Sequence, residues 1–454
     1  MPYTSLNPAT NQIVQTYVSW DDQRLKQVLE KTCHAQQAWA QTPFWRRAEV
    51  LRDAALRLHA QRDQYATLIT QEMGKPLREA HAEIEKCAGV CDYYAQHAEN
   101  FLRTEAGESD AGKSYIAHYP LGVVLAIMPW NFPFWQAFRA AAPALMAGNA
   151  LLLKHAPNVP QCALAIETIF RDCGLPEGLF TTLMIEIEQV ADAIASPHVH
   201  AVTLTGSEAA GRKVAALAGQ HLKKCVLELG GSDPFIVLHD ADLELAVNMA
   251  VASRFMNCGQ SCIAAKRFII VPQIADEFLH RLKIKVATLS LGDPMDDVTQ
   301  IGPMARADLR DELHRQVSES IAQGAVAVTG CQPIKGAGFF YQPSILDQVT
   351  AATCAYHEEL FGPVATIIRA ASEDDAMRIA NDTRFGLGSS IWSRDTARAE
   401  RLAAHIEAGS TFINGMVKSD PRLPFGGVKA SGYGRELSRL GLLEFTNAKT
   451  VWVR

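Results

Sequence analysis

The chain has 454 residues, 48% of them hydrophobic, which is enough to bury one or two sizeable cores. Lys and Arg total 43 against 49 Asp and Glu, so no basic surplus is available for a phosphate backbone and we expect no nucleic-acid partner. The first residues lack a basic start followed by an apolar run, and no stretch reaches the roughly 20 apolar residues of a membrane span. We therefore expect a cytoplasmic protein without a membrane partner.

The pattern of apolar residues predicts the order of the elements. Residues 21–103 read as a run of amphipathic helices, because their apolar residues are spaced three and four apart. Short runs of branched apolar residues then predict buried strands that alternate with helices. The expected strands cover 121–128, 199–204 and 224–229 and a segment that begins at 150, and the expected helices include 163–173 and 208–219. This alternation predicts a doubly wound parallel sheet, and its continuation after residue 228 predicts a second α/β lobe.

Ten cysteines are spread along the chain without paired spacing, which is typical of reduced thiols in a chain with no export signal. The most informative is Cys262 in FMNCGQSCIAAK (255–266), where it follows a Gly-Gln-Ser turn and precedes an apolar segment that we expect to be helical or buried. Such a turn can expose a thiol, which acts as a nucleophile only when a nearby dipole, cation or base lowers its pKa. Taken alone, a cysteine is more often a small buried hydrophobe. Cys258 raises a metal or disulfide alternative, but no second pair has zinc spacing and we predict no metal site.

Two further motifs carry polar residues at the ends of predicted strands. VLELGGSDPF (226–235) places Glu228 before two glycines that allow close approach of backbone, so this carboxylate either faces a cleft or is a solvated strand-end residue. PWNFP (129–133) holds the amide of Asn131 at the end of a buried strand. A side-chain amide beside a backbone N–H suits a developing oxyanion, although Asn131 could equally be a turn residue.

Taken together and in this order, PWNFP, ELGG and GQSC resemble the pattern of the aldehyde dehydrogenase superfamily. The interval between Glu228 and Cys262 suits that family. Further matches extend the resemblance over nearly the whole chain: TGSEAAG at 205–211, EELFGP at 358–363, FING at 412–415 and PFGGVKASGYGRE at 424–436.

The resemblance implies an aldehyde dehydrogenase-like α/β fold with a doubly wound cofactor-binding domain, an α/β catalytic domain and a small oligomerisation element. We place these at residues 1–228, 229–439 and 440–454, with an oligomerisation hairpin near 105–120. A C-terminal strand at 447–453 would then add to a neighbour's sheet in a homodimer or homotetramer. The alternative is that hairpin and strand are ordinary edge strands.

The resemblance also implies roles for the motif residues. Cys262 would be the nucleophile that forms a thioester with the aldehyde, and Asn131 with the main-chain N–H of Cys262 would be the oxyanion hole. Glu228 would activate the water that releases the acid. Relatives that transfer the acyl group to coenzyme A generally lack this glutamate, so we expect hydrolytic turnover.

For the cofactor, Gly206 and Ser207 would begin a helix whose N-terminus faces the pyrophosphate, in place of the GxGxxG of the ordinary dinucleotide fold. The other cofactor residues that the resemblance implies are Trp130, Asn131, Lys154, Leu229, Glu359 and Phe361. Pro157 stands where many strictly NAD-dependent members carry a glutamate that repels a 2′-phosphate. The absence of this carboxylate predicts that the protein uses both NAD and NADP.

For the substrate, Arg139 occupies a position that is often aromatic in members that oxidise apolar aldehydes, and an arginine could hold a distal carboxylate. With the run MVKSDPRLPFGG, it makes the chain resemble the short bacterial succinate semialdehyde dehydrogenases. Phe132 and Phe425 would form apolar walls, and Asp420 would lie in the loop that covers the pocket. One observation argues against succinate semialdehyde as the substrate: other succinate semialdehyde enzymes carry a second arginine at the position that Met256 occupies here.

Three alternatives remain open at this point. A broad-specificity aldehyde dehydrogenase would leave Arg139 incidental. A cysteine hydrolase would use Cys262 with a histidine and no nicotinamide, but none of the 14 histidines lies in the motifs above. A non-enzymatic relative, of the kind found as lens proteins, would be expected to lose the nucleophile or the base, and here both remain.

Overall fold

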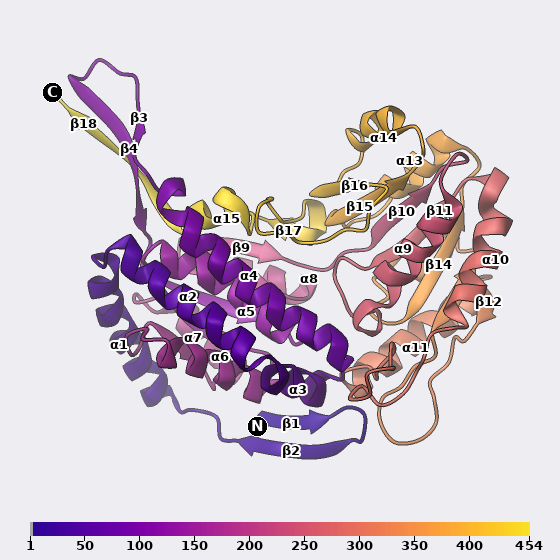
Figure 1. Cartoon of the computed structure of the whole chain (residues 1–454), viewed down its shortest axis with the longest axis horizontal. Coiled ribbons are helices and arrows are strands. Elements are labelled where there is room, and N and C mark those ends of the chain that lie inside the picture. Colours follow the sequence, from indigo (N-terminus) through magenta and orange to yellow (C-terminus); the bar gives the residue numbers. More distant parts are fainter. Residues whose placement is uncertain (1–2) are drawn as a thin grey trace.

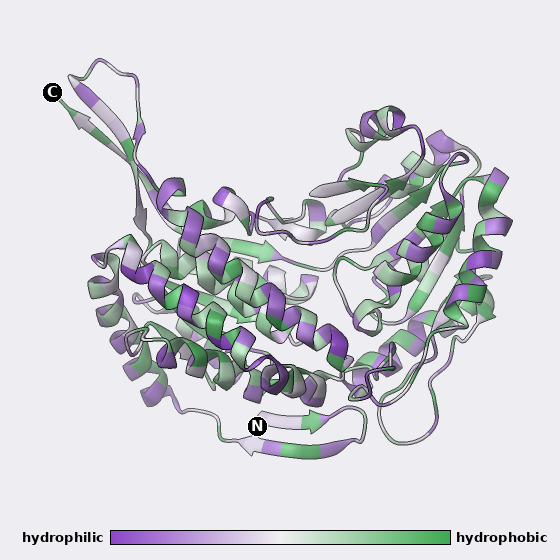
Figure 2. Ribbon diagram, viewed as in Figure 1, coloured by the Kyte–Doolittle hydropathy of each residue, from purple (hydrophilic) through white to green (hydrophobic). Residues whose placement is uncertain are grey.

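In the computed structural model, residues 3–454 are described, and within them two large sheets with their helices form two lobes that lie side by side (Figure 1). The chain begins with a hairpin of β1 (Tyr3–Asn7) and β2 (Gln12–Tyr17). The predicted run of helices follows as α1 (Asp22–Ala40), α2 (Phe44–Ala60), α3 (Arg62–Met73) and α4 (Leu77–Phe101). Figure 2 shows hydrophobic and hydrophilic bands alternating along α2 and α4, as expected of helices that bury one face.

The first sheet is doubly wound, as predicted. Its strands are β5 (Val123–Met128), β6 (Ala150–His155), β7 (Phe180–Thr182), β8 (Ala201–Thr205) and β9 (Lys224–Glu228). The crossover helices are α5 (Pro133–Met146), α6 (Pro160–Asp172), α7 (Gln189–Ala195) and α8 (Glu208–Gln220). The order β9-β8-β5-β6-β7 reverses at β5, because the chain adds β6 and β7 on one side and then β8 and β9 on the other. The connections after β5 and β8 therefore diverge and leave a crevice at the carboxyl ends of these strands.

The second sheet has the order β12-β13-β14-β11-β10-β15-β16. Its strands are β10 (Asp233–Val237), β11 (Ala265–Ile270), β12 (Val326–Thr329), β13 (Ser344–Asp347), β14 (Val364–Arg369), β15 (Gly388–Trp392) and β16 (Ser410–Ile413). The accompanying helices are α9 (Leu243–Phe255), α10 (Ala275–Val286), α11 (Ala307–Ala322), α12 (Cys354–His357), α13 (Glu373–Asn381) and α14 (Thr396–Ala403). Short 3-10 turns lie at Met256–Gly259, Pro272–Ile274 and Lys429–Ser431. The strands pair in parallel except β12, so the predicted second α/β lobe is confirmed.

After β16 the chain returns to the first lobe. Strand β17 (Gly432–Tyr433) pairs antiparallel with β9, and α15 (Ser438–Glu444) contributes Leu442 to the core of the first lobe. The sequence did not indicate this return. The division of the chain at residues 228 and 439 stays a proposal.

A narrow arm projects from the first lobe (Figure 1). It consists of β3 (Glu105–Ala106), β4 (Lys113–Pro120) and β18 (Thr446–Val453), with β18 paired along the whole length of β4. The predicted hairpin and C-terminal strand therefore meet within one chain, and both carry exposed apolar side chains such as Tyr119 and Trp452. Among the described residues, no helix combines the length and the apolar character needed to cross a membrane.

Candidate active site

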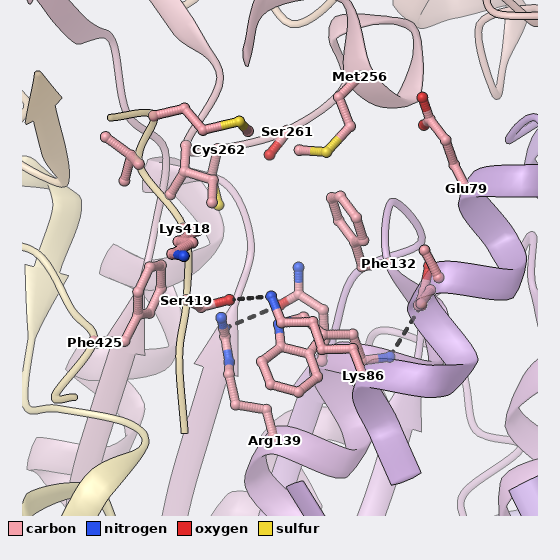
Figure 3. Close-up of a pocket in the computed structure, with 17 residues that line it drawn as sticks. Glu79, Lys86, Phe132, Arg139, Met256, Ser261, Cys262, Lys418, Ser419 and Phe425 are labelled. Carbon is pink, nitrogen blue, oxygen red and sulfur yellow. Dashed lines mark hydrogen bonds between the residues drawn. The ribbon is translucent and has the colours of Figure 1, made fainter. Parts of the chain in front are cut away.

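Two cavities meet at Cys262. The strand-end cavity lies at the carboxyl ends of β5 and β8, where the reversal of strand order leaves a crevice, and its lining includes most of the predicted cofactor residues: Trp130, Asn131, Gly206, Ser207, Leu229, Glu359 and Phe361. The helix-side cavity lies between α4, α5 and the loops at 256–263 and 416–425, and it is drawn in Figure 3. Cys262 and Gln136 line both cavities. Cys262 therefore borders both cavities.

The turn before Cys262 has an unusual backbone. Asn257, Cys258 and Gly259 all have positive φ angles, of 54°, 53° and 70°, a conformation that costs free energy for residues with a side chain. Buried contacts hold it: the Glu79 carboxylate accepts the N–H of Asn257 at 2.6 Å, and the Arg254 guanidinium donates to the carbonyl of Gly259 at 3.0 Å. The segment after the turn is the buried strand β11 rather than a helix.

Cys262 is a free thiol, and no disulfide joins any cysteines within residues 3–454. Burial raises the pKa of Cys262 to about 11, while the positive charges of Arg139 and Lys266 act in the opposite direction. The resting thiol is therefore protonated at neutral pH and must lose a proton to react. Its main-chain N–H donates to no acceptor in the described part of the chain, which leaves it available to a ligand.

A chain of buried hydrogen bonds orients Asn131. Arg139 donates to Oε1 of Gln136 at 3.2 Å, Nε2 of Gln136 donates to Oδ1 of Asn131 at 3.2 Å, and Nδ2 of Asn131 donates to the carbonyl of Gln260 at 3.1 Å. A guanidinium can only donate and a carbonyl can only accept, so the two ends fix the orientation of both amides. The amide of Asn131 therefore presents its NH2 group on the side of the Cys262 turn, where its second hydrogen is free for an oxyanion.

Glu228 lies at the end of β9 and lines neither cavity. The residue is 2% exposed, and neither carboxyl oxygen has a hydrogen-bond partner among the described residues. It is so close to the backbone of Gly426 that a Cβ there would lie 2.6 Å from Oε1. Burial raises the pKa of Glu228, the neighbouring Glu436 raises it further, and Arg139 lowers it. In this arrangement Glu228 is a buried acid outside the linings of both cavities, and its surroundings favour the protonated form more than water does.

The strand-end cavity fits a dinucleotide. Ser207 caps α8 by accepting the N–H of Ala210 at 3.3 Å, and Gly206 and Ser207, just before the helix, line the cavity. Gly211 allows the close approach of Leu229, because a Cβ at this glycine would lie 2.5 Å from the leucine side chain. Glu359 accepts the N–H of Gly231 at 3.1 Å and forms an ion pair with Lys266 at 3.1 Å. The rings of Trp130 and Phe361 lie edge to face, 5.9 Å apart, and add flat apolar surface to the cavity.

Lys154 and Pro157 lie outside this lining. Lys154 is buried near the end of β6, where its Nζ donates to the carbonyl of His155 at 2.9 Å and lies 5.1 Å from the centre of the Tyr3 ring. Burial lowers the pKa of Lys154 to about 8, and the carboxylate of Glu186 opposes this shift. Pro157 is exposed just beyond the strand. The role of both residues at the adenosine end of a cofactor stays a prediction.

The helix-side cavity brings together Arg139, Phe132 and Phe425, three of the predicted substrate residues. Arg139 does not extend into it as a free cation, because it forms an ion pair with Glu436 and lies 4.9 Å from the centre of the Phe425 ring. Asp420 is absent from the lining and pairs with Arg422 at 2.6 Å, which holds the pKa of Asp420 at about 2. A direct role for Asp420 with substrate stays a prediction. Met256, at the position of the missing second arginine, does line the cavity.

Several lining residues were missed by the sequence reasoning, namely Lys86, Trp135, Gln136 and Ser419. A signal for Lys86 was present in α4, where Glu79, Glu83 and Lys86 follow one another at helical spacing beside the apolar stripe of a mostly buried helix. Charged residues in such a stripe are uncommon unless they are paired or functional. No comparable local signal marks Gln136 or Ser419, because their role depends on which elements converge.

Comparison with known proteins agrees with this geometry. The sequence profile of the aldehyde dehydrogenase family matches residues 1–451. The chain is 50% identical over 453 residues to a probable succinate-semialdehyde dehydrogenase [NADP(+)] of Synechocystis, covering 100% of both chains. It is 48% identical over 450 residues to the succinate semialdehyde dehydrogenase [NAD(P)+] Sad of Escherichia coli, covering 99% of this chain and 97% of that protein.

A similar solved structure is that of succinic semialdehyde dehydrogenase from Streptococcus pyogenes with NADP+. It aligns with a TM-score of 0.98 at 39% identity and covers 99% of each chain. The protein belongs to the aldehyde dehydrogenase family. The predicted family and fold are thereby confirmed.

Proposed function

We propose that this protein oxidises succinate semialdehyde to succinate with NAD or NADP through a thioester on Cys262. The observation that carries the proposal is that Cys262 lies where two cavities meet, one suited to a dinucleotide and the other lined by Arg139. The names of the relatives above point to the same substrate and to both cofactors. The identity to these relatives of about half of all residues over the full chain supports the same activity for this protein.

The first chemical step is attack by the thiolate of Cys262 on the aldehyde carbon, after the thiol has given up its proton. The carbonyl oxygen becomes an oxyanion, which the amide of Asn131 and the free main-chain N–H of Cys262 can stabilise. A nicotinamide ring bound in the strand-end cavity would supply the acceptor for the hydride lost by this carbon. The carbon remains bound to sulfur as a thioester.

The second step is hydrolysis of this thioester. Glu228 would take a proton from a water molecule, whose oxygen attacks the thioester carbon, and the acid would leave as the thiolate of Cys262 is restored. Because Glu228 lines neither cavity, its carboxyl group would have to swing toward the thiol. Gly426 beside it leaves room that a larger residue would fill.

Assembly and location also remain proposals. We infer a homodimer or homotetramer formed through the arm of β3, β4 and β18, supported by its exposed apolar residues, including Ile116, Tyr119, Trp452 and Val453. A cytoplasmic setting follows from the sequence expectation above. Sedimentation of a monomer at micromolar concentration would rule out the proposed assembly.

The test is the rate of cofactor reduction with succinate semialdehyde, butanal and benzaldehyde, each with NAD and with NADP. A high and selective kcat/KM for the semialdehyde is expected. Similar values for all three aldehydes would instead favour a broad-specificity aldehyde dehydrogenase, and no rate with any of them would favour the hydrolase or the non-enzymatic alternative.

A further inference from the structure

Lys86 of α4 reaches the wall of the helix-side cavity beside Arg139 (Figure 3). Its Nζ donates a hydrogen bond to Oγ of Ser419 at 2.6 Å and lies 4.2 Å from the centre of the Trp135 ring. Three separate parts of the fold, α4, α5 and the loop 416–425, therefore converge on this ammonium group. The ring contact and the hydroxyl hold the lysine head in one place while leaving hydrogen-bond donors unused.

Among the other charged side chains that line this cavity, Lys418 is exposed to solvent and the rest have partners. Arg139 is paired with Glu436, and Glu83 is paired with Lys75 and accepts the N–H groups of Phe134 and Trp135. Glu79 accepts the N–H of Asn257.

Lys86 differs, because no carboxylate lies within 4.0 Å of its Nζ among residues 3–454. Burial and the positive charge of Arg139 together lower the pKa of Lys86 to about 8, although the carboxylates of Glu83 and Asp420 oppose this shift. A partly desolvated cation next to a second cation is unfavourable unless an anion completes the site.

We propose that Lys86, with Ser419, is a second contact for the distal carboxylate of the substrate. The inference rests on the proposed function and deepens it, because it supplies the cation that Met256 does not provide. The ammonium group can donate to a carboxylate oxygen while it keeps its bond to Ser419. Arg139, already neutralised by Glu436, then contributes from beside Lys86 (Figure 3). An aldehyde without a carboxylate would gain nothing from Lys86.

The test compares Lys86→Met, which keeps the length of the side chain and its packing on Trp135, with Lys86→Arg, which keeps the charge. We expect Lys86→Met to raise the KM for succinate semialdehyde about tenfold or more with little change in kcat, since one charge-assisted hydrogen bond is lost. The kcat/KM for butanal should change less than twofold. Lys86→Arg should restore most of the affinity. Lys285→Met, on the exposed side of α10, controls for loss of a positive charge elsewhere.

Binding of succinate provides a second readout that does not depend on turnover. Inhibition of butanal oxidation by succinate should weaken about tenfold in Lys86→Met and stay unchanged in Lys285→Met. Suppose that the unmodified protein prefers succinate semialdehyde and that Lys86→Met keeps both this preference and the inhibition by succinate. The proposed role of Lys86 is then wrong, and the proposed function stands. If the unmodified protein shows no preference for the semialdehyde, the proposed function itself fails. Equal losses with both aldehydes would mean that Lys86 is only structural.

Discussion

Arg139 and Glu436 form an ion pair whose side chains are only 3% and 1% exposed. Arg139 comes from α5 and Glu436 from the segment that returns to the first lobe after β17. The same guanidinium donates to Gln136 and to Thr205, and its charge lowers the pKa of Glu228 while Glu436 raises it. The pair therefore connects the substrate cavity, the orientation of Asn131 and the ionisation of the expected general base.

Replacing Arg139 should affect stability as well as substrate binding. Arg139→Leu leaves the carboxyl group of Glu436 buried without its partner, which typically costs about 3 kcal/mol in the free energy of unfolding. We expect the KM for succinate semialdehyde to rise far more than the KM for butanal, because only the former carries a carboxylate. Urea unfolding and steady-state kinetics measure the two effects.

The double variant Arg139→Leu with Glu436→Leu serves as the control, because it replaces both buried charges with apolar side chains. It should recover most of the lost stability without recovering affinity for the semialdehyde. Equal effects of Arg139→Leu on the two aldehydes would contradict a carboxylate contact, and a single variant as stable as the unmodified protein would contradict the importance of the ion pair.

Replacing Glu228 should separate the two chemical steps. Glu228→Gln keeps the shape of the side chain but cannot accept a proton, so thioester formation continues and hydrolysis slows by about 10²- to 10⁴-fold. Rapid mixing should then show a burst of about one reduced cofactor per subunit followed by a slow rate. A steady rate equal to that of the unmodified protein would show that Glu228 is not the base.

The pH dependence of the unmodified protein follows from the same group. Burial and Glu436 raise the pKa of Glu228, so the fraction of ionised base, and with it the rate of hydrolysis, should increase as the pH rises through that raised pKa. The folded state also holds this proton more tightly than the unfolded state, so this site becomes less favourable to folding as the pH rises toward the raised pKa. Glu228→Gln should therefore unfold at a higher temperature than the unmodified protein at alkaline pH. An identical pH profile for the two proteins would contradict the assignment.

Gln136 should act on catalysis without contacting the substrate carboxylate. In Gln136→Glu both side-chain oxygens are acceptors, so Asn131 can no longer accept through Oδ1 and its amide is free to turn its NH2 group away from the oxyanion. We expect kcat/KM to fall by about tenfold to a hundredfold for succinate semialdehyde and butanal alike, which approaches the cost of losing an oxyanion donor. Gln136→Met removes the hydrogen bond to Asn131 without offering a competing acceptor, so its kcat/KM should fall less. Loss confined to the semialdehyde would place Gln136 in substrate binding instead.

The sequence predicted the elements and the chemical motifs more completely than their contacts. The strands β5, β6, β8 and β9 could be predicted because buried parallel strands are short apolar runs separated by helices. Asn131 and Cys262 could be found because each lies in a distinctive local motif, and the lining of the strand-end cavity brings them together.

Contacts between distant segments could not be predicted in this way. The pairing of Arg139 with Glu436 joins residues that are far apart in the sequence, and Lys86 reaches the cavity only because α4 packs beside α5. Neither contact changes the local spacing of apolar residues in the sequence. The position of Glu228 outside both cavity linings likewise could not be predicted, because Gly426 approaches it from a loop that follows the second sheet.

The last prediction concerns the choice between NAD and NADP. Glu186 lies in the segment after β7, where the hydroxyl of Tyr3 donates to the carbonyl of Ile185 at 2.5 Å and the Tyr3 ring also contacts Lys154. The charge of Glu186 raises the pKa of Lys154, so the two groups are close enough to interact. If Lys154 contacts the adenosine ribose, as its position in the family pattern implies, the negative charge of Glu186 opposes a 2′-phosphate there.

Glu186→Gln should therefore lower the KM for NADP about threefold or more and change the KM for NAD less than twofold, with a smaller difference at high salt. Glu188→Gln, an exposed substitution two residues later, should alter neither constant. Parallel shifts for both cofactors in Glu186→Gln would mean that this carboxylate does not distinguish them.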